Sequence, residues 1–476
     1  MSSPTQAISR SLPVTSRLAR LWDQRGRRTA HALTATGSGA LASSLLSAMG
    51  SKLLAAQGGP VAIAALVSLQ QVRQAALIAA TVNGQTAVIQ GASSRVDQER
   101  REYVRTSALI FLGASLLVCA GLVWLPTRLW QIAGLGLLDD AVSRWIAVSV
   151  LSSSALIFLT SILNAMGKIH RLAKVQVVSP LVIALGMWPA ARAIATRSVT
   201  QGSEILAALV ALATLVAAAA AAWCLWMNWP EWRNWVRGHG AWWSNAAAKS
   251  YLSVSLAMLV SGLIATGALM LVRSRIIAHQ GLTVAGWFDA AWNISMNHAS
   301  LLLASLQTYC LPLLARAKSA REQSEHITSV LMLAMPVAAA MIAAIAIARP
   351  WIVELLYASS FRASSGLLRW TLLGDYLKIG SWILSLPLLA RADMKAFLLL
   401  DTAAYAAFVG ASFVLARRIP GAESAAIGFV CMYATHLIAG VALAKWRCGI
   451  RLESMMPAIR RLSSRQMSRS PTTRLN

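Results

Sequence analysis

The fold is indicated by a stretch of sequence that occurs twice. Lys52-Leu-Leu-Ala-Ala-Gln-Gly-Gly-Pro-Val-Ala62 aligns without gaps to Arg275-Ile-Ile-Ala-His-Gln-Gly-Leu-Thr-Val-Ala285, at an offset of 223 residues. Five of the eleven positions are identical, and three more are conservative. Because the offset is close to half of the 476-residue chain, the match predicts two related halves.

Apolar runs long enough to cross a membrane surround both copies of this stretch. The chain is 57% hydrophobic and 13% charged, with a mean hydropathy of +0.59, which excludes soluble and disordered proteins. A helix of roughly 20 apolar residues crosses a bilayer. The sequence predicts twelve spans, at 32–56, 61–85, 106–126, 145–166, 173–190, 203–228, 250–272, 282–310, 326–348, 369–390, 395–416 and 424–444.

The two halves have the same predicted orientation, because each contains an even number of spans. We therefore predict an all-α polytopic membrane protein with a parallel repeat, in which substrate binds between two six-helix lobes that rock against each other. The predicted parts are a basic cytoplasmic arm (1–31), an N-lobe (32–228), a cytoplasmic linker (229–249), a C-lobe (250–444) and a basic cytoplasmic tail (445–476).

The net charge of +26 is explained by membrane topology rather than by nucleic-acid binding. If the amino terminus is cytoplasmic, most Lys and Arg residues lie in the two tails and in the cytoplasmic loops. This bias predicts a multi-pass membrane protein with both termini cytoplasmic. It predicts contacts with anionic inner-membrane lipids and no nucleic-acid partner.

Residues for catalysis or for metal binding are not evident in the sequence. The five cysteines are scattered singly and form no CxxC pair. Neither a phosphate-binding glycine loop nor a long extramembrane loop with clustered acids is present. We therefore predict no cofactor, no metal and no enzymatic activity.

Polar residues in the second span share one helical face. Gln70, Arg73 and Gln74 are spaced i, i+3 and i+4. A charge within a span is costly, and Arg73 is predicted near mid-membrane, too deep to reach water easily. Because a guanidinium suits phosphate or carboxylate, this face predicts a substrate-binding surface.

The eighth span has a similar polar face. Asp289, Asn293 and Asn297 are spaced i, i+4 and i+8. Two interpretations of Asp289 are open: a role in coupling, or a structural ion pair with Arg73 across the halves. The nearby His298 is interpreted as a packed, hydrogen-bonded histidine.

Four further charges lie within or at the ends of spans. Lys52 is a candidate cleft residue, although it can also extend to the membrane interface. Asp375 and Lys378 are one helical turn apart and can neutralise each other. Asp401 is a candidate for coupling or for charge pairing. The predicted cleft residues are Arg73, Lys52, Lys378, Gln70, Gln74, Asn293 and Asn297, and the candidates for coupling or pairing are Asp289, Asp375 and Asp401.

Two blocks of the second half resemble a known family. They are Ala285-Gly-Trp-Phe-Asp-Ala-Ala-Trp-Asn-Ile-Ser295 and Arg369-Trp-Thr-Leu-Leu-Gly-Asp-Tyr-Leu-Lys-Ile-Gly-Ser-Trp-Ile-Leu384. Both resemble the Wzx-type translocases of O-antigen and enterobacterial common antigen, within the multidrug/oligosaccharidyl-lipid/polysaccharide exporters. The similarity runs from about residue 33 to 445.

The resemblance implies a V-shaped cleft and flipping of undecaprenyl-diphosphate-linked glycan across the inner membrane. Lys52, Asp375 and Lys378 match positions of the family pattern. The sequence departs from it after Asn83-Gly, where the family usually has a Lys-Tyr pair. The implied partners are the lipid-linked glycan, a glycan polymerase and a chain-length regulator, and the transporter is expected to be monomeric.

Two other functions stay open at this point. A cation-coupled exporter of small molecules or drugs has the same architecture, although Arg73, Lys52 and Lys378 argue against cationic drugs. A membrane-embedded glycan polymerase or glycosyltransferase is the third alternative. The missing pairs of catalytic carboxylates argue against it.

Overall fold

The computed structural model describes the backbone of residues 14–124, 139–196, 199–238, 241–316, 319–391, 393–419 and 421–450. Within these ranges the chain forms helices and no strand, as the predicted all-α class requires. The elements are α1 (Val14–Ala80), α2 (Gln85–Ser94), α3 (Asp97–Trp124), α5 (Asp140–Ala165), α6 (Ile169–Ala195), α7 (Val199–Trp226), α8 (Trp229–Val236), α9 (Asn245–Arg316), α10 (Ala320–Leu356), the short turn η1 (Ser359–Phe361), α11 (Ser364–Ala390), α12 (Met394–Leu415) and α13 (Glu423–Cys448).

The two longest helices are each broken by one glycine. Gly59 has φ 61° and ψ −161° within α1, and Gly281 has φ 82° and ψ 174° within α9. This backbone conformation is essentially restricted to glycine. Each helix therefore contains two of the predicted spans. Gly281 aligns with Gly58, one residue before the first break, so the sequence repeat is also a structural repeat.

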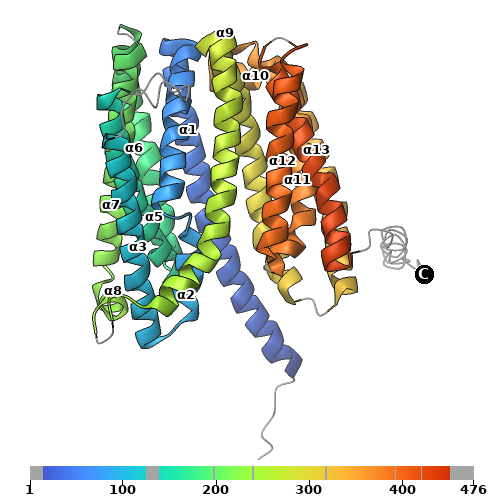
Figure 1. The fold of residues 1–476 in the computed structure, drawn as a ribbon. Helices are drawn as coiled ribbons and strands as arrows, with labels where there is room; N and C mark the ends of the chain where they lie inside the picture. Colours follow the sequence, from blue (N-terminus) through green and yellow to red (C-terminus); the bar gives the residue numbers. More distant parts are fainter. Residues whose placement is uncertain are drawn as a thin grey trace, which may run out of the picture.

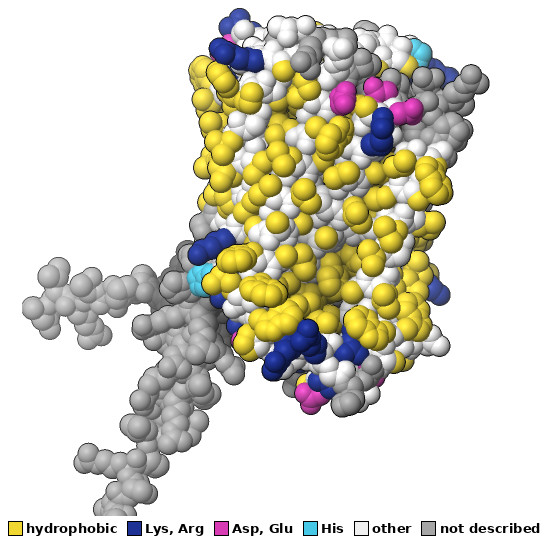
Figure 2. Space-filling view, turned by 90° about the vertical axis from the view of Figure 1, so that its left-hand side faces the viewer, with side chains coloured by type: hydrophobic (Ala, Val, Ile, Leu, Met, Phe, Trp, Pro, Cys, Tyr) yellow, Lys and Arg dark blue, Asp and Glu magenta, His cyan; other side chains and the backbone are white. Residues whose placement is uncertain are grey.

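Ten helices of the described ranges are long and apolar enough to cross a membrane. Two of them, α1 and α9, are broken at a glycine, and each accounts for two of the twelve predicted spans. The helices stand side by side in one bundle (Figure 1). Large apolar side chains such as Leu117 and Ile347 are exposed on the outside. On the face shown in Figure 2, hydrophobic side chains cover the middle, and Lys and Arg lie toward the two ends. This is the pattern expected where lipid surrounds the middle of a bundle.

The first group of helices runs from α1 to α7 and the second from α9 to α13. Within the groups, α1 packs against α6, α5 against α7, and α13 against both α11 and α12. Helices α1 and α9 pack against each other and join the groups (Figure 1). We call the end of the bundle at the two glycine breaks the hairpin end, and the opposite end the α8 end.

Contacts between the groups occur at both ends. At the hairpin end, Lys52 Nζ donates to the carbonyl oxygen of Glu354 at 2.5 Å. Toward the α8 end, the Tyr251 hydroxyl donates to the carbonyl oxygen of Thr81 at 2.8 Å. The segment predicted as a basic arm differs from expectation in one respect, because α1 begins at Val14 and runs through most of it. The predicted tail beyond Ile450 lies outside the described residues.

Candidate functional site

A cavity of about 540 Å³ lies between α1 of the first group and α9, α12 and α13 of the second. Its volume is within the usual range for small-molecule sites, about 300–1,000 Å³. We call it the central cavity. The polar and aromatic residues that line it are Gln70, Gln71, Arg73, Gln74, Thr266, Asp289, Trp292, Asn293, Tyr405, Phe408 and Tyr433, together with Met296 and Met432.

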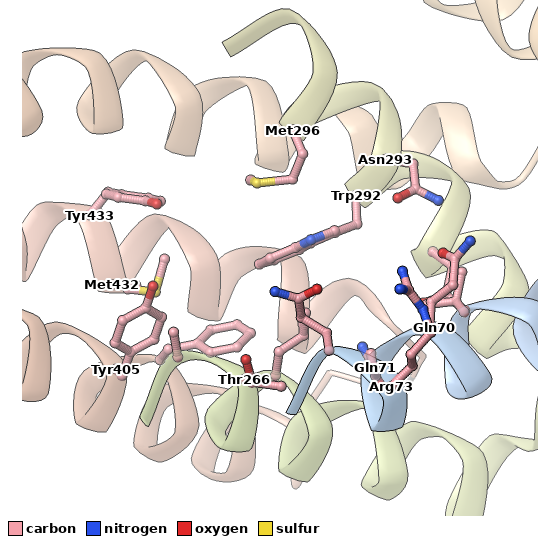
Figure 3. A pocket seen from close by; sticks show the side chains of 16 residues that line it. Gln70, Gln71, Arg73, Thr266, Trp292, Asn293, Met296, Tyr405, Met432 and Tyr433 are labelled. Carbon is pink, nitrogen blue, oxygen red and sulfur yellow. The ribbon is translucent and has the colours of Figure 1, made fainter. Parts of the chain in front are cut away.

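The central cavity has two chemically different walls. Helix α1 contributes amides and a guanidinium, from residues such as Gln70, Gln71 and Arg73. Helices α12 and α13 contribute the rings of Tyr405 and Tyr433 and apolar side chains. Figure 3 shows these two groups on opposite sides, with the Trp292 indole extending between them from α9. Polar groups facing aromatic rings are suited to a ligand that has both hydroxyl groups and apolar faces.

Among the described residues, one hydrogen bond holds the Arg73 guanidinium at the cavity. Its Nη1 donates to the Ser153 hydroxyl of α5 at 3.1 Å. Its Nε is buried and has no hydrogen-bond partner. Among the described residues, no carboxylate lies within 4.0 Å of the guanidinium. A buried cation without a counter-charge is costly, so an anionic ligand would be stabilised here.

Asp289 pairs with a different arginine from the one the sequence predicts. Arg273, also in α9, donates from Nε to Oδ1 and from Nη2 to Oδ2, both at 2.8 Å. Both side chains are only 2% exposed. Arg273 also donates to the Ser68 hydroxyl and the Ala64 carbonyl oxygen of α1, at 2.6 and 2.5 Å. The interpretation of Asp289 as an ion-pair partner of Arg73 is therefore wrong. The pair of Arg273 and Asp289 instead links α9 to α1, the two helices that are broken at a glycine.

Asp375 and Lys378 lie behind the cavity wall rather than in it. Asp375 is fully buried; the Ser295 hydroxyl donates to its Oδ2 at 2.6 Å, and His298 Nε2 lies 3.3 Å from the same oxygen. Lys378 Nζ is 3.3 Å from the sulfur of Met296 and 5.6 Å from the ring centroid of Tyr433. No ion pair within 4.0 Å joins Asp375 to Lys378 in the described ranges. Lys378 thus lies behind Met296 and Tyr433, whose side chains line the central cavity.

Asp401 belongs to a second carboxylate–histidine pair. The Ser261 hydroxyl of α9 donates to Oδ2 at 2.5 Å, and His436 Nε2 of α13 lies 3.5 Å from Oδ1. Asp401 and Asp375 thus share an arrangement, each carboxylate contacting one serine and one histidine. His436 is absent from the sequence-based candidates. No group of three His, Cys, Asp or Glu side chains suited to a metal ion occurs among the described residues.

The predicted cleft residues divide into two sets in space. Gln70, Arg73, Gln74 and Asn293 line the central cavity together. Lys52 is not among the lining residues; it contacts the carboxyl-terminal turn of α10 instead. Asn297 is exposed and also does not line the cavity. The rest of the wall includes residues that sequence reasoning missed, which are Gln71, Trp292, Tyr405 and Tyr433.

Curated proteins similar to this chain are lipid flippases. The chain is 25% identical over 208 residues to the lipid III flippases of Escherichia coli (strain K12) and Shigella flexneri. The aligned part is 43% of this chain, and the chain spans about half (49%) of the length of these relatives. No protein-family model matches the sequence.

Solved structures similar to this one are membrane transporters. The inward-facing conformation of a multidrug resistance MATE family transporter has a TM-score of 0.67 at 15% identity, over 89% of this chain and 96% of that one. The inward closed conformation of the lipid II flippase MurJ has a TM-score of 0.67 at 11% identity, over 92% of each chain. The two-group helical bundle of this protein therefore has the fold of the transporters of the MOP superfamily.

Proposed function

We propose that this protein flips undecaprenyl-diphosphate-linked oligosaccharide repeat units from the cytoplasmic to the periplasmic leaflet by alternating access. The repeat unit would be a precursor of O-antigen, capsule or exopolysaccharide. The proposal rests on Arg73, a cation that lines the central cavity and whose buried Nε has no hydrogen-bond partner among the described residues. The diphosphate of such a lipid would supply the missing counter-charge.

The remainder of the cavity suits the sugars of the same substrate. The amides of Gln70, Gln71 and Asn293 can donate to and accept from hydroxyl groups. The rings of Trp292 and Tyr433 offer flat apolar surfaces to the faces of sugar rings. The polyprenyl tail needs no polar cavity, because it can stay in the surrounding lipid throughout transport.

The similar proteins support this assignment over the export of cationic drugs. The curated relatives are named lipid III flippases, and one structural relative is a lipid II flippase. The MATE transporters share the fold, but a cavity containing Arg73 repels organic cations. The inner-membrane location, the cytoplasmic termini, the monomeric state, the polymerase and the chain-length regulator stay predictions.

We also propose that Asp401 couples transport to a proton gradient together with His436. The Asp401 side chain, on α12, is 16% exposed, and the His436 side chain, on α13, is 9% exposed. A proton that this carboxylate–imidazole pair takes up from one side of the membrane and releases to the other changes the net charge between these helices. Asp289 is a poorer candidate because Arg273 holds both of its oxygens.

Replacement of Arg73 tests whether its charge binds the substrate. Arg73→Gln removes the charge and keeps a polar amide at this position. Loss of a charged hydrogen bond costs about 1.5–3 kcal/mol, so we expect export in a complemented deletion strain to fall about tenfold or more. Arg73→Lys should recover part of it, because it restores the charge without the planar fork.

Arg192→Gln is the matched control, since Arg192 also lies in a membrane helix, stacks on Trp188 and does not line the cavity. Lipid-linked units should accumulate on the cytoplasmic leaflet with Arg73→Gln and not with Arg192→Gln. Normal export by Arg73→Gln at normal protein level would contradict the role of Arg73.

A further inference from the structure

A second cavity, of about 170 Å³, lies among α9, α12 and α13 of the second group. The polar and aromatic side chains that line it are Arg275, His279, Gln280, Ser412, Phe413 and Ser424. It shares no lining residue with the central cavity. We call it the hairpin-end cavity, because Gln280 immediately precedes the break at Gly281.

The two cavities are stacked along the same three helices. On α9 the lining passes from Leu269 in the central cavity to Val272 in the second, and on α12 from Phe408 to Ser412. These are steps of about one helical turn. An aromatic layer lies beside this boundary, where the Trp292 ring is 6.0 Å from Phe408 and 4.9 Å from Phe429. The hairpin-end cavity is therefore a separate space in line with the central one.

The hairpin-end cavity has a positive character. The Arg275 guanidinium lies 4.5 Å from the ring centroid of Phe413, and no carboxylate is within 4.0 Å of it in the described part of the chain. His279 adds a second basic group, and no Asp or Glu is among the lining residues. Glu423, next to Ser424, binds other groups: its Oε1 accepts hydrogen bonds from Arg369 Nη2 at 2.5 Å and from Trp370 Nε1 at 2.7 Å.

Two buried polar atoms beside these cations have no hydrogen-bond partner: the amide oxygen Oε1 of Gln280 and the hydroxyl Oγ of Ser412. Ser412 is 3% exposed. A Cβ on Gly428 would lie 2.1 Å from the Ser412 hydroxyl, so the glycine permits the close approach of α13. Buried polar groups are normally paired, and an unpaired one costs about 1–3 kcal/mol. An amide oxygen accepts only, so it needs a donor such as a ligand hydroxyl.

We propose that the hairpin-end cavity is a second binding site, for a sugar unit that carries an anionic group. Arg275 and His279 bind the carboxylate or phosphate, while Gln280 and Ser412 bind sugar hydroxyls. The volume of about 170 Å³ has room for one monosaccharide unit rather than for an oligosaccharide. The site does not depend on flipping, because its residues and its ligand chemistry are independent of Arg73.

Direct binding to the purified full-length protein in lipid nanodiscs tests this site. The probes are glucuronate and glucose 6-phosphate, with glucose and inorganic phosphate as the counter-probes, each measured by saturation-transfer NMR. We expect both charged sugars to bind at least tenfold more tightly than either counter-probe. Phosphate binding as tightly as the charged sugars would overturn the assignment of Gln280 and Ser412 to hydroxyl groups. Glucose binding as tightly would overturn the assignment of Arg275.

Variants separate this site from the central cavity. Arg275→Gln should weaken glucuronate binding at least tenfold, and the milder Ser412→Ala should weaken it severalfold even if Arg275→Gln does not fold. Arg192→Gln, at a residue that lines neither cavity, should leave it unchanged. Loss of binding in Arg73→Gln, with none in Ser412→Ala, would place the probe in the central cavity and overturn the proposal. Failure of flipping alone would leave these affinities as expected.

Discussion

Arg273 and Asp289 form a two-point ion pair between the two segments of α9, with both side chains only 2% exposed. The same guanidinium donates to Ser68 and to the Ala64 carbonyl oxygen, which belong to α1. The pair therefore holds the two segments of one repeat and also contacts the other repeat. Any movement that separates α1 from α9 here must break two hydrogen bonds of a buried cation, which is expensive without other partners.

Removal of one member of this pair should destabilise the protein strongly. Asp289→Leu leaves Arg273 buried and charged, for an expected loss of about 3–5 kcal/mol in the free energy of unfolding. The double variant Arg273→Met with Asp289→Leu should lose less than Asp289→Leu alone, since Ser68 already donates to the Ala64 carbonyl oxygen at 2.9 Å. Thermal unfolding in detergent measures both. A double variant that loses more stability than Asp289→Leu alone would contradict this account.

An exposed ion pair provides the control. Lys168 and Glu231 are 2.9 Å apart but 30% and 56% exposed. Glu231→Gln should therefore change stability by less than about 1 kcal/mol.

The glycines at the two breaks should not tolerate a side chain. Gly59→Ala and Gly281→Ala put Cβ on a backbone with positive φ, at an expected cost of about 1–3 kcal/mol each, although neither Cβ would touch another atom within 4 Å. Gly267→Ala in α9 is the matched control. It has equally open space but lies in regular helix, so alanine should be neutral or stabilising. Equal unfolding temperatures for all three variants would contradict the strain argument.

Gly286→Ala should move the halves apart at the hairpin end. A Cβ on Gly286 would lie 2.1 Å from the carbonyl oxygen of Pro60, an atom of the backbone that cannot turn aside. We expect the distance between spin labels on α1 and α9 near the breaks to increase, as measured by pulsed electron paramagnetic resonance. Gly267→Ala should leave the distance unchanged. An unchanged distance in Gly286→Ala would show that the two repeats do not approach each other here.

Asp401 should determine whether a proton gradient drives export. The wild-type protein should lose export when an ionophore collapses the gradient, whereas Asp401→Asn should export slowly with or without it, since the asparagine cannot carry a proton. Glu325→Gln, at an exposed acid, is the control and should behave as wild type. Wild-type export that is insensitive to the ionophore would contradict proton coupling.

The sequence predicts the helices well because membrane spans depend on local apolar runs. The two helix breaks, at Gly59 and Gly281, both lie within the repeated stretch and differ by one residue in its alignment. The helical repeat of 3.6 residues per turn is enough to place Gln70, Arg73 and Gln74 on one face. All three line the central cavity. These features depend on residues a few positions apart, which a single sequence displays directly.

Partners that are distant in the chain are harder to predict. Arg273 follows the apolar run predicted to end at residue 272, so it is assigned to a loop; in the structure α9 continues, and the guanidinium is buried against Asp289. Ser153, which contacts Arg73 across 80 residues, has no distinguishing pattern in the sequence. Pairings of this kind follow from helix packing, which spacing does not specify. Tyr405 and Tyr433 are missed for the same reason.

Flipping by the purified protein is the most direct test of the central claim. The protein is reconstituted into liposomes containing undecaprenyl-diphosphate-linked oligosaccharide, and a membrane-impermeant enzyme that cleaves the glycan reports which leaflet it occupies. We predict that the inner-leaflet pool becomes accessible quickly with the wild-type protein and at least tenfold more slowly with Arg73→Gln. Accessibility no faster than in protein-free liposomes, under an imposed proton gradient of either direction, would contradict the proposed function.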